Sequence, residues 1–140
     1  TIAAQTTGYT PQGITYFRMT AINSGSNFAF WGVSVSGTKD LTAFATGNLK
    51  LAVRVAPQLG AGPNVRVEIN DGSITRGVDL VNFGFSPLGA DWQEITIPVG
   101  AFTGQGIALA TIKNPFAIAL QFIPAAATFT VDVDAVRWEK

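Results

Sequence analysis

Residues 28–35 read FAFWGVSV, and their order sets a geometric problem for the rest of the chain. Neighbouring residues of a β-strand point to opposite faces of a sheet, so Phe30 and Trp31 cannot both be buried. If Phe28 and Phe30 face inward, Trp31 faces outward, and a bulge at Gly32 restores the inward parity of the valines that follow. An outward indole offers a flat surface on which a ligand can stack. The alternatives are that a loop covers Trp31, or that Trp31 belongs to the core and Phe30 lies outside.

Composition limits the classes of function that the chain can have. Its 140 residues suit one domain, residues 1–140, with a core of its own. The sequence has no cysteine and no histidine, which excludes disulfides, thiolate chemistry, histidine-based nucleophilic catalysis and histidine-ligated zinc. Nine basic and nine acidic residues balance, so the chain lacks the electrostatic signature of a nucleic-acid or anionic-membrane partner.

Hydropathy and the first residues bear on location. No apolar run approaches the roughly 20 residues that a membrane helix needs, so we expect no membrane partner. The sequence starts at Thr1 without a basic segment followed by an apolar one. We therefore expect either a cytoplasmic protein or an excised mature segment, and the residues alone do not decide between them.

Alternation of apolar and polar residues predicts β-strands along most of the chain. It is clearest where Leu49, Leu51, Val53 and Val55 alternate with more polar residues. Other segments are rich in β-branched and aromatic residues and are bounded by Gly, Asn, Asp or Pro. A single helical turn capped by Asp40 is expected after residue 40. The expected strands are 14–22, 28–35, 49–55, 65–70, 77–83, 92–98, 116–122 and 128–138.

Eight strands without longer helical periodicity predict an all-β fold, a two-sheet antiparallel β-sandwich. In jelly-roll order the first, eighth, third and sixth strands form one sheet, and the second, seventh, fourth and fifth form the other. This second sheet holds the strand of Trp31 and three strands with unusual outward residues. We therefore expect these outward residues to share one face.

Three strands of the second sheet carry candidate ligand contacts beside Trp31. One strand places three hydrogen-bonding side chains in a row, and another has two alanines that make a shallow surface. The row could equally be a solvated face, and another element could cover the alanines. The expected ligand-binding residues are Trp31, Arg66, Glu68, Asn70, Asp79, Phe83, Ala117, Ala119 and Gln121.

Four segments carry a family resemblance: DLTAFATGNLKLAVRV (40–55), WQEITIPVGAF (92–102), IKNPFAIALQF (112–122) and FTVDVDAVRW (129–138). They resemble the β-sandwich carbohydrate-binding modules of bacterial glycoside hydrolases. In that family a D-L-S/T-x-[YF] turn precedes a strand, a W-x-x-[IV]-x-I-P-[LV] strand follows, and a D-x-[IV]-x-W strand ends the domain. The resemblance covers about residues 28 to 138, and it points to the endoglucanase-linked β-glucan binders of family 81.

The resemblance implies a non-catalytic, monomeric, secreted module, fused to a glycoside hydrolase. Its expected ligands are β-1,4-glucan and mixed-linkage β-1,3-1,4-glucan, xyloglucan, cellulose and cello-oligosaccharides of the plant cell wall. Stacking on Trp31 and hydrogen bonds from the neighbouring polar side chains suit the faces and hydroxyls of sugar rings. Such modules often bind a structural calcium, which implies Asp134 and Asp40 as ligands here. The usual earlier carboxylate is missing, so Asp134 could instead be a surface residue without a metal.

Two other classes of function stay open at this stage. Glu68 and Asp79 lie on neighbouring strands, as the two carboxylates of a small glycoside hydrolase would. A plain sandwich of this length leaves little loop to build the deep site that such an enzyme needs. The third class is a structural or protein-adhesion domain that associates through its outer face.

Overall fold

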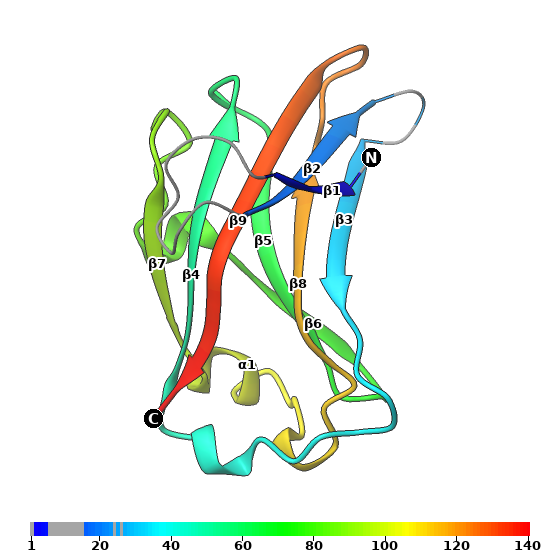
Figure 1. The fold of residues 1–140 in the computed structure, drawn as a ribbon, viewed down its shortest axis with the longest axis vertical. Helices are drawn as coiled ribbons and strands as arrows, with labels where there is room; N and C mark the ends of the chain where they lie inside the picture. The colour runs from blue at the N-terminus through cyan, green and yellow to red at the C-terminus, as the bar shows by residue number, and fades with distance from the viewer. Residues whose placement is uncertain (1, 6–15, 24, 26) are drawn as a thin grey trace.

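The computed structural model describes residues 2–5, 16–23, 25 and 27–140, which form two packed β-sheets closed at one end by short helical turns (Figure 1). The strands are β1 (Ile2–Gln5), β2 (Tyr16–Ile22), β3 (Phe28–Val33), β4 (Asn48–Ala56), β5 (Asn64–Asn70), β6 (Thr75–Asp79), β7 (Gln93–Pro98), β8 (Asn114–Gln121) and β9 (Thr128–Glu139). The helical turns are η1 (Thr42–Phe44), η2 (Leu80–Phe83), α1 (Gly100–Thr103) and η3 (Leu109–Thr111). None of these helices is long and apolar enough to cross a bilayer, among the residues just given.

The sheet order confirms the predicted sandwich. One sheet has the order β1-β2-β9-β4-β7, and the other has the order β3-β8-β5-β6. All pairings are antiparallel. The eight expected strands fall into the two sheets in the expected order, and β1, which the sequence reading missed, adds one edge strand beside β2.

The core lies between the sheets and follows from the alternation in the sequence. In β5, Val65, Val67 and Ile69 are fully buried, and the residues between them are half-buried on the opposite face. In β4, every second residue is apolar and buried in the same core, namely Leu49, Leu51, Val53 and Val55. Because side chains alternate along a strand, burial of one set fixes the polar residues between them on the outside.

Two local departures from regular strands change which residues face outward. The expected strand 77–83 ends at Asp79, and the chain continues as the short helix η2. Phe83 therefore does not follow the alternation, and it packs half-buried against the core instead of facing outward. The expected helical turn is present as η1, and the Asp40 carboxylate accepts hydrogen bonds from the backbone N–H and the hydroxyl of Thr42.

Candidate functional site

The outer face of the four-stranded sheet brings together most of the expected polar residues. Across the ladder, Arg66 lies opposite Ala119 on one side and Asp79 on the other, and Glu68 lies opposite Ala117 and Gly77. Phe28 pairs with Gln121 and Phe30 with Ala119. Directly opposed residues point to the same side of a sheet. The outer face therefore carries Phe28, Phe30, Gly32, Asn64, Arg66, Glu68, Asn70, Thr75, Gly77, Asp79, Ala117, Ala119 and Gln121.

The expected outward orientation of Trp31 is wrong. Trp31 lies opposite the fully buried Ile118 and packs against the core, stacked on Phe17 at 4.9 Å between ring centroids and edge-on to Phe116 at 6.1 Å. The expected bulge at Gly32 is absent, because β3 keeps one register with β8 over its whole length. The large ring fills the space between β2 and β3 where the two sheets meet at the side of the sandwich. The alternative that placed Trp31 inside and Phe30 outside is the one that the structure adopts.

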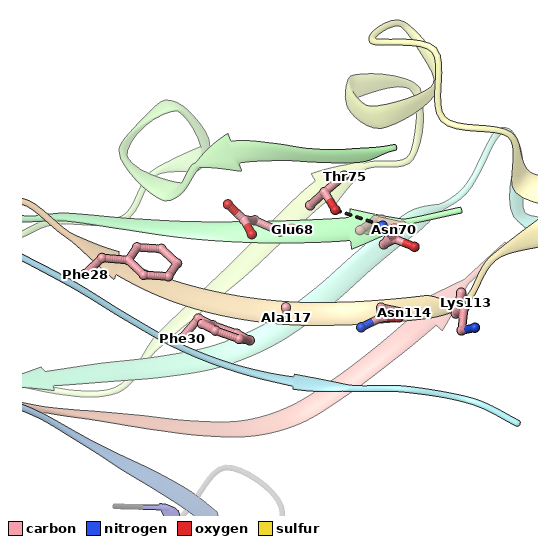
Figure 2. Close-up of a pocket in the computed structure, with 9 residues that line it drawn as sticks. Phe28, Phe30, Glu68, Asn70, Thr75, Lys113, Asn114 and Ala117 are labelled. Carbon is pink, nitrogen blue, oxygen red and sulfur yellow. Dashed lines mark hydrogen bonds between the residues drawn. The ribbon is translucent and has the colours of Figure 1, made fainter. Parts of the chain in front are cut away.

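Two phenylalanines take the exposed position that was expected for Trp31. Phe28 is 39% exposed and Phe30 is 61% exposed. Their ring centroids lie 5.7 Å apart, and the ring planes differ by 32°. They come from residues i and i+2 of one strand, which point to the same side. Figure 2 shows the two rings side by side at one end of a groove.

Small residues make the floor of this face low. Ala119 is fully buried and Ala117 nearly so, beneath the level of the larger side chains around them. A Cβ on Gly32 would lie 2.7 Å from the Cβ of Ala117, so the backbones of β3 and β8 are bare at this point. The result is a groove of about 400 Å³ that runs along the sheet. Its lining residues are Phe28, Phe30, Glu68, Ile69, Asn70, Thr75, Lys113, Asn114 and Ala117 (Figure 2).

Polar side chains on β5 and β6 lie along one side of the outer face, and three of them, Glu68, Asn70 and Thr75, form a wall of the groove. The Nε atom of Arg66 lies 3.4 Å from Oδ1 of Asp79 and 3.8 Å from Oε1 of Glu68. A Cβ on Gly77 would lie 2.8 Å from Nη2 of Arg66, so the guanidinium lies across the bare backbone of β6. Both carboxylates lie beside this cation, whereas the general acid of a glycosidase lies in an apolar pocket. The wall offers oriented hydrogen-bonding groups rather than an acid and base pair.

Asn70 lies at the end of this wall, and part of its hydrogen-bonding capacity is taken up by the turn that follows β5. Its side-chain nitrogen donates to Oγ1 of Thr75 at 2.8 Å, and its side-chain oxygen accepts the N–H of Gly72 at 2.7 Å. An amide has two N–H groups and two lone pairs, so one donor and one acceptor site remain. The neighbouring Asp71 is buried and accepts backbone N–H groups from Ser73, Ile74 and Ala108. These hydrogen bonds, most of all that from Ala108, hold the pKa of the Asp71 carboxyl below its ordinary value.

The groove contains some of the expected site residues and several that the sequence reading missed. Glu68, Asn70 and Ala117 line it, whereas Arg66, Asp79, Ala119 and Gln121 share the outer face beside it. Trp31 and Phe83 face elsewhere. Phe28, Phe30, Thr75, Lys113 and Asn114 were missed. The run FAFW has no alternation to show which of its rings face outward, and Asn114 reaches the groove through a register shift between β5 and β8.

The structure gives the surroundings of the two expected calcium ligands, Asp40 and Asp134. The Asp40 carboxylate is occupied by Thr42, and these hydrogen bonds, first that of the hydroxyl, lower its pKa. Asp134 lies within β9, in a second groove beside Phe17 and Trp31. The part of the chain that the structure describes has no group of three acidic side chains able to hold a metal ion. The calcium site stays a prediction, which melting curves with and without a chelator would test.

The fold is that of known carbohydrate-binding modules. No protein-family model matches the sequence, and no curated protein sequence matches it either. A family 30 carbohydrate-binding module superposes with a TM-score of 0.71 at 17% identity, covering 97% of this chain and 72% of that one. The family 30 module of a cellulosomal cellulase of Clostridium thermocellum gives 0.67 at 17% identity, covering 97% and 80%.

A similar domain also occurs within a much larger protein. An exo-1,3/1,4-β-glucanase of a Pseudoalteromonas species matches with a TM-score of 0.57 at 19% identity, and the match covers 99% of this chain and 16% of that enzyme. The expected resemblance to β-sandwich carbohydrate-binding modules is thus confirmed at the level of the fold. The closer assignment to family 81 stays a prediction.

Proposed function

We propose that this chain is a non-catalytic carbohydrate-binding module that holds a β-glucan chain in the groove of the four-stranded sheet. The observation that carries the proposal is the pair Phe28 and Phe30, exposed beside a low floor and facing a wall of polar side chains. Sugar rings have apolar faces that stack on aromatic rings and hydroxyls that need hydrogen-bonding partners at their edges. A groove with rings on one side and Glu68, Asn70 and Thr75 on the other meets both needs.

The shape of the aromatic pair favours single glucan chains in solution. Rings inclined by 32° to one another cannot both lie flat on the plane of a crystal. They can stack on successive sugars of a chain that twists along its length. We therefore infer that soluble β-1,4-glucan and mixed-linkage β-glucan, xyloglucan and cello-oligosaccharides are preferred over crystalline cellulose. Two of the similar structures, a module of a cellulase and an exo-1,3/1,4-β-glucanase, support this class of ligand.

The wider role follows from the same proposal. A module without an acid and base pair contributes by keeping an attached enzyme near its polysaccharide. We propose that this chain serves an endoglucanase in that way and acts outside the cell, where plant cell-wall polysaccharides are found. The similar domain within a much larger glucanase supports such a fusion.

Phe30→Ala tests the proposal directly. Micromolar to millimolar binding corresponds to about 4 to 8 kcal/mol, and a central aromatic anchor contributes roughly 2 kcal/mol or more. Binding of mixed-linkage β-glucan, measured by gel retardation and titration calorimetry, should therefore weaken at least about thirtyfold. Because the ring is mostly exposed, the unfolding temperature should change little.

The matched control is Phe17→Ala. Phe17 is 46% exposed on β2, away from the groove, and its loss should leave glucan binding unchanged. Unaltered retardation of Phe30→Ala would contradict the proposal. Release of reducing sugar from β-glucan that disappears in Glu68→Gln would instead indicate a hydrolase.

A further inference from the structure

Phe122, directly after β8, combines two unusual properties. Strand alternation with Phe116, Ile118 and Leu120 would place it in the core, yet its side chain is 61% exposed. Its φ angle is +57°, in the left-handed region. Bulky residues with a Cβ rarely adopt this conformation, because the side chain crowds the backbone. Strained positions that persist in a fold often serve its function.

The surrounding backbone explains why residue 122 turns out of the sheet. Ile123 takes the inward place and is only 2% exposed. Its N–H donates to the carbonyl of Asn27 at 3.0 Å, and its carbonyl accepts from Nδ2 of Asn23 at 2.6 Å. Residue 122 is the extra residue between Gln121 on the outer face and Ile123 in the core. Glycine would meet this demand without steric conflict.

The fold therefore needs the turn at this position but not the phenyl ring. Most of the ring lies in solvent, where it adds little to the core. An exposed aromatic side chain held in an unfavourable backbone conformation is better explained by contact with something outside the domain. The question is what lies next to it.

Phe122 lies at the open end of the aromatic pair. Phe28 pairs with Gln121, and Asn27 bonds to Ile123, so Phe122 is adjacent to Phe28 across the ladder. The other end of the groove is formed by Lys113 and Asn114 (Figure 2). Along the two paired strands, Phe30, Phe28 and residue 122 thus come in this order toward the same end of the sheet. Phe28 lines the groove and Phe122 does not.

We propose that Phe122 provides an additional stacking position that extends the glucan site beyond Phe28. This inference rests on the proposed function and deepens it, because it makes affinity depend on chain length. A short oligosaccharide fills the groove between Phe28 and Asn114. A longer one continues past Phe28 and stacks a further sugar on Phe122.

The test is titration calorimetry with cellotriose and cellohexaose on wild type, Phe122→Ala, Phe122→Gly and Phe30→Ala. Wild type should bind cellohexaose more tightly than cellotriose. Both Phe122 variants should lose about tenfold in affinity for cellohexaose, equivalent to ~1.4 kcal/mol, and keep their affinity for cellotriose. Phe30→Ala should lose affinity for both. Glycine suits the left-handed backbone, so Phe122→Gly should unfold at a temperature no lower than Phe122→Ala.

Three results would overturn the inference, and they differ in what they leave standing. Wild-type affinity for cellohexaose in both Phe122 variants, with binding lost in Phe30→Ala, would remove the extra position and retain the proposed function. An equal loss for both oligosaccharides would show that Phe122 only supports the groove. A wild-type protein that binds neither these oligosaccharides nor mixed-linkage β-glucan would remove the proposed function and this inference together.

Discussion

The outer faces of the two sheets carry similar side chains, but only one face leaves them open. On the five-stranded sheet, Asp132 is 1% exposed and accepts hydrogen bonds from both Arg18 and Arg54. The Arg54 guanidinium also lies over the rings of Tyr16 and Trp92. Aromatic, basic and acidic groups there contact one another.

On the four-stranded sheet Arg66 also lies beside Glu68 and Asp79, but the two phenylalanines lie across the low floor from Glu68. Phe28 is 39% exposed and Phe30 is 61% exposed, and small residues keep the floor between them and the polar wall low. The comparison shows that residue types alone do not identify a binding face. What matters is whether the side chains stay exposed or are buried against one another, and the following changes test that distinction.

The largest expected loss of folding stability comes from Trp31, which packs between the two sheets. Trp31→Ala removes a ring that packs on Phe17 and Phe116, and it should lower the free energy of unfolding by about 3 kcal/mol. Chemical denaturation would measure this loss. Glucan binding should persist under conditions where the variant is folded. Unchanged stability together with lost binding would restore Trp31 as the stacking surface.

Asp132→Asn tests the closed face. Removing the carboxylate leaves two guanidinium groups facing each other over a buried amide, and the expected loss is about 2 kcal/mol because both arginines reach solvent. Glucan binding should not change. Asp91→Asn, at an exposed position of the same charge, is the control and should stay within about 0.5 kcal/mol of wild type. Reduced glucan affinity in folded Asp132→Asn would show that the ligand uses the other face.

Ala117→Leu tests the low floor of the open face. A leucine would project into the groove between Phe30 and Glu68, so glucan affinity should fall about tenfold or more, ~1.4 kcal/mol, with both phenylalanines still present. Ala110→Leu, at an exposed position in η3, is the matched control and should bind normally. Normal binding by Ala117→Leu would mean that the ligand does not enter the groove.

Acid should lower the folding stability that the Asp71 carboxylate contributes beside the Asn70 end of the groove. Because hydrogen bonds from Ala108, Ile74 and Ser73 depress the pKa of this carboxyl in the folded state, its stabilisation is present at neutral pH. That stabilisation is lost as pH falls below the ordinary aspartate range and through the lower folded pKa. Asp71→Asn should thus be less stable than wild type near pH 7. Denaturant titrations should show the difference shrinking as the pH falls below the ordinary aspartate range, and a constant difference would contradict this origin.

Much of this architecture was predictable from the sequence. Regular alternation of apolar and polar residues identifies a β-strand and also shows which of its side chains face the core. Val65, Val67 and Ile69 fixed the outward direction of Arg66, Glu68 and Asn70, and the structure agrees. Jelly-roll order then placed β8 and its alanines beside them. The binding role of these residues stays a prediction.

The failures have a common physical cause, which is that alternation was absent or interrupted. Four apolar residues in a row, Phe28 to Trp31, contain no information on parity, so the wrong aromatic was chosen. Phe83 follows a strand that turns into η2 at Leu80. Alternation along β8 points Phe122 to the core, but its left-handed backbone inserts an extra residue before Ile123. Such local departures depend on tertiary packing and leave little trace in the sequence.

The position of β3 at the edge of the four-stranded sheet has a consequence for handling the protein. An edge strand presents unpaired backbone groups, and one with exposed apolar side chains can pair with a second copy of itself. β3 carries Phe28 and Phe30 beside such an edge, so concentrated samples should tend to aggregate. A soluble glucan that covers the two rings should slow this process. Adding the polysaccharide to a concentrated sample should then keep the protein in solution.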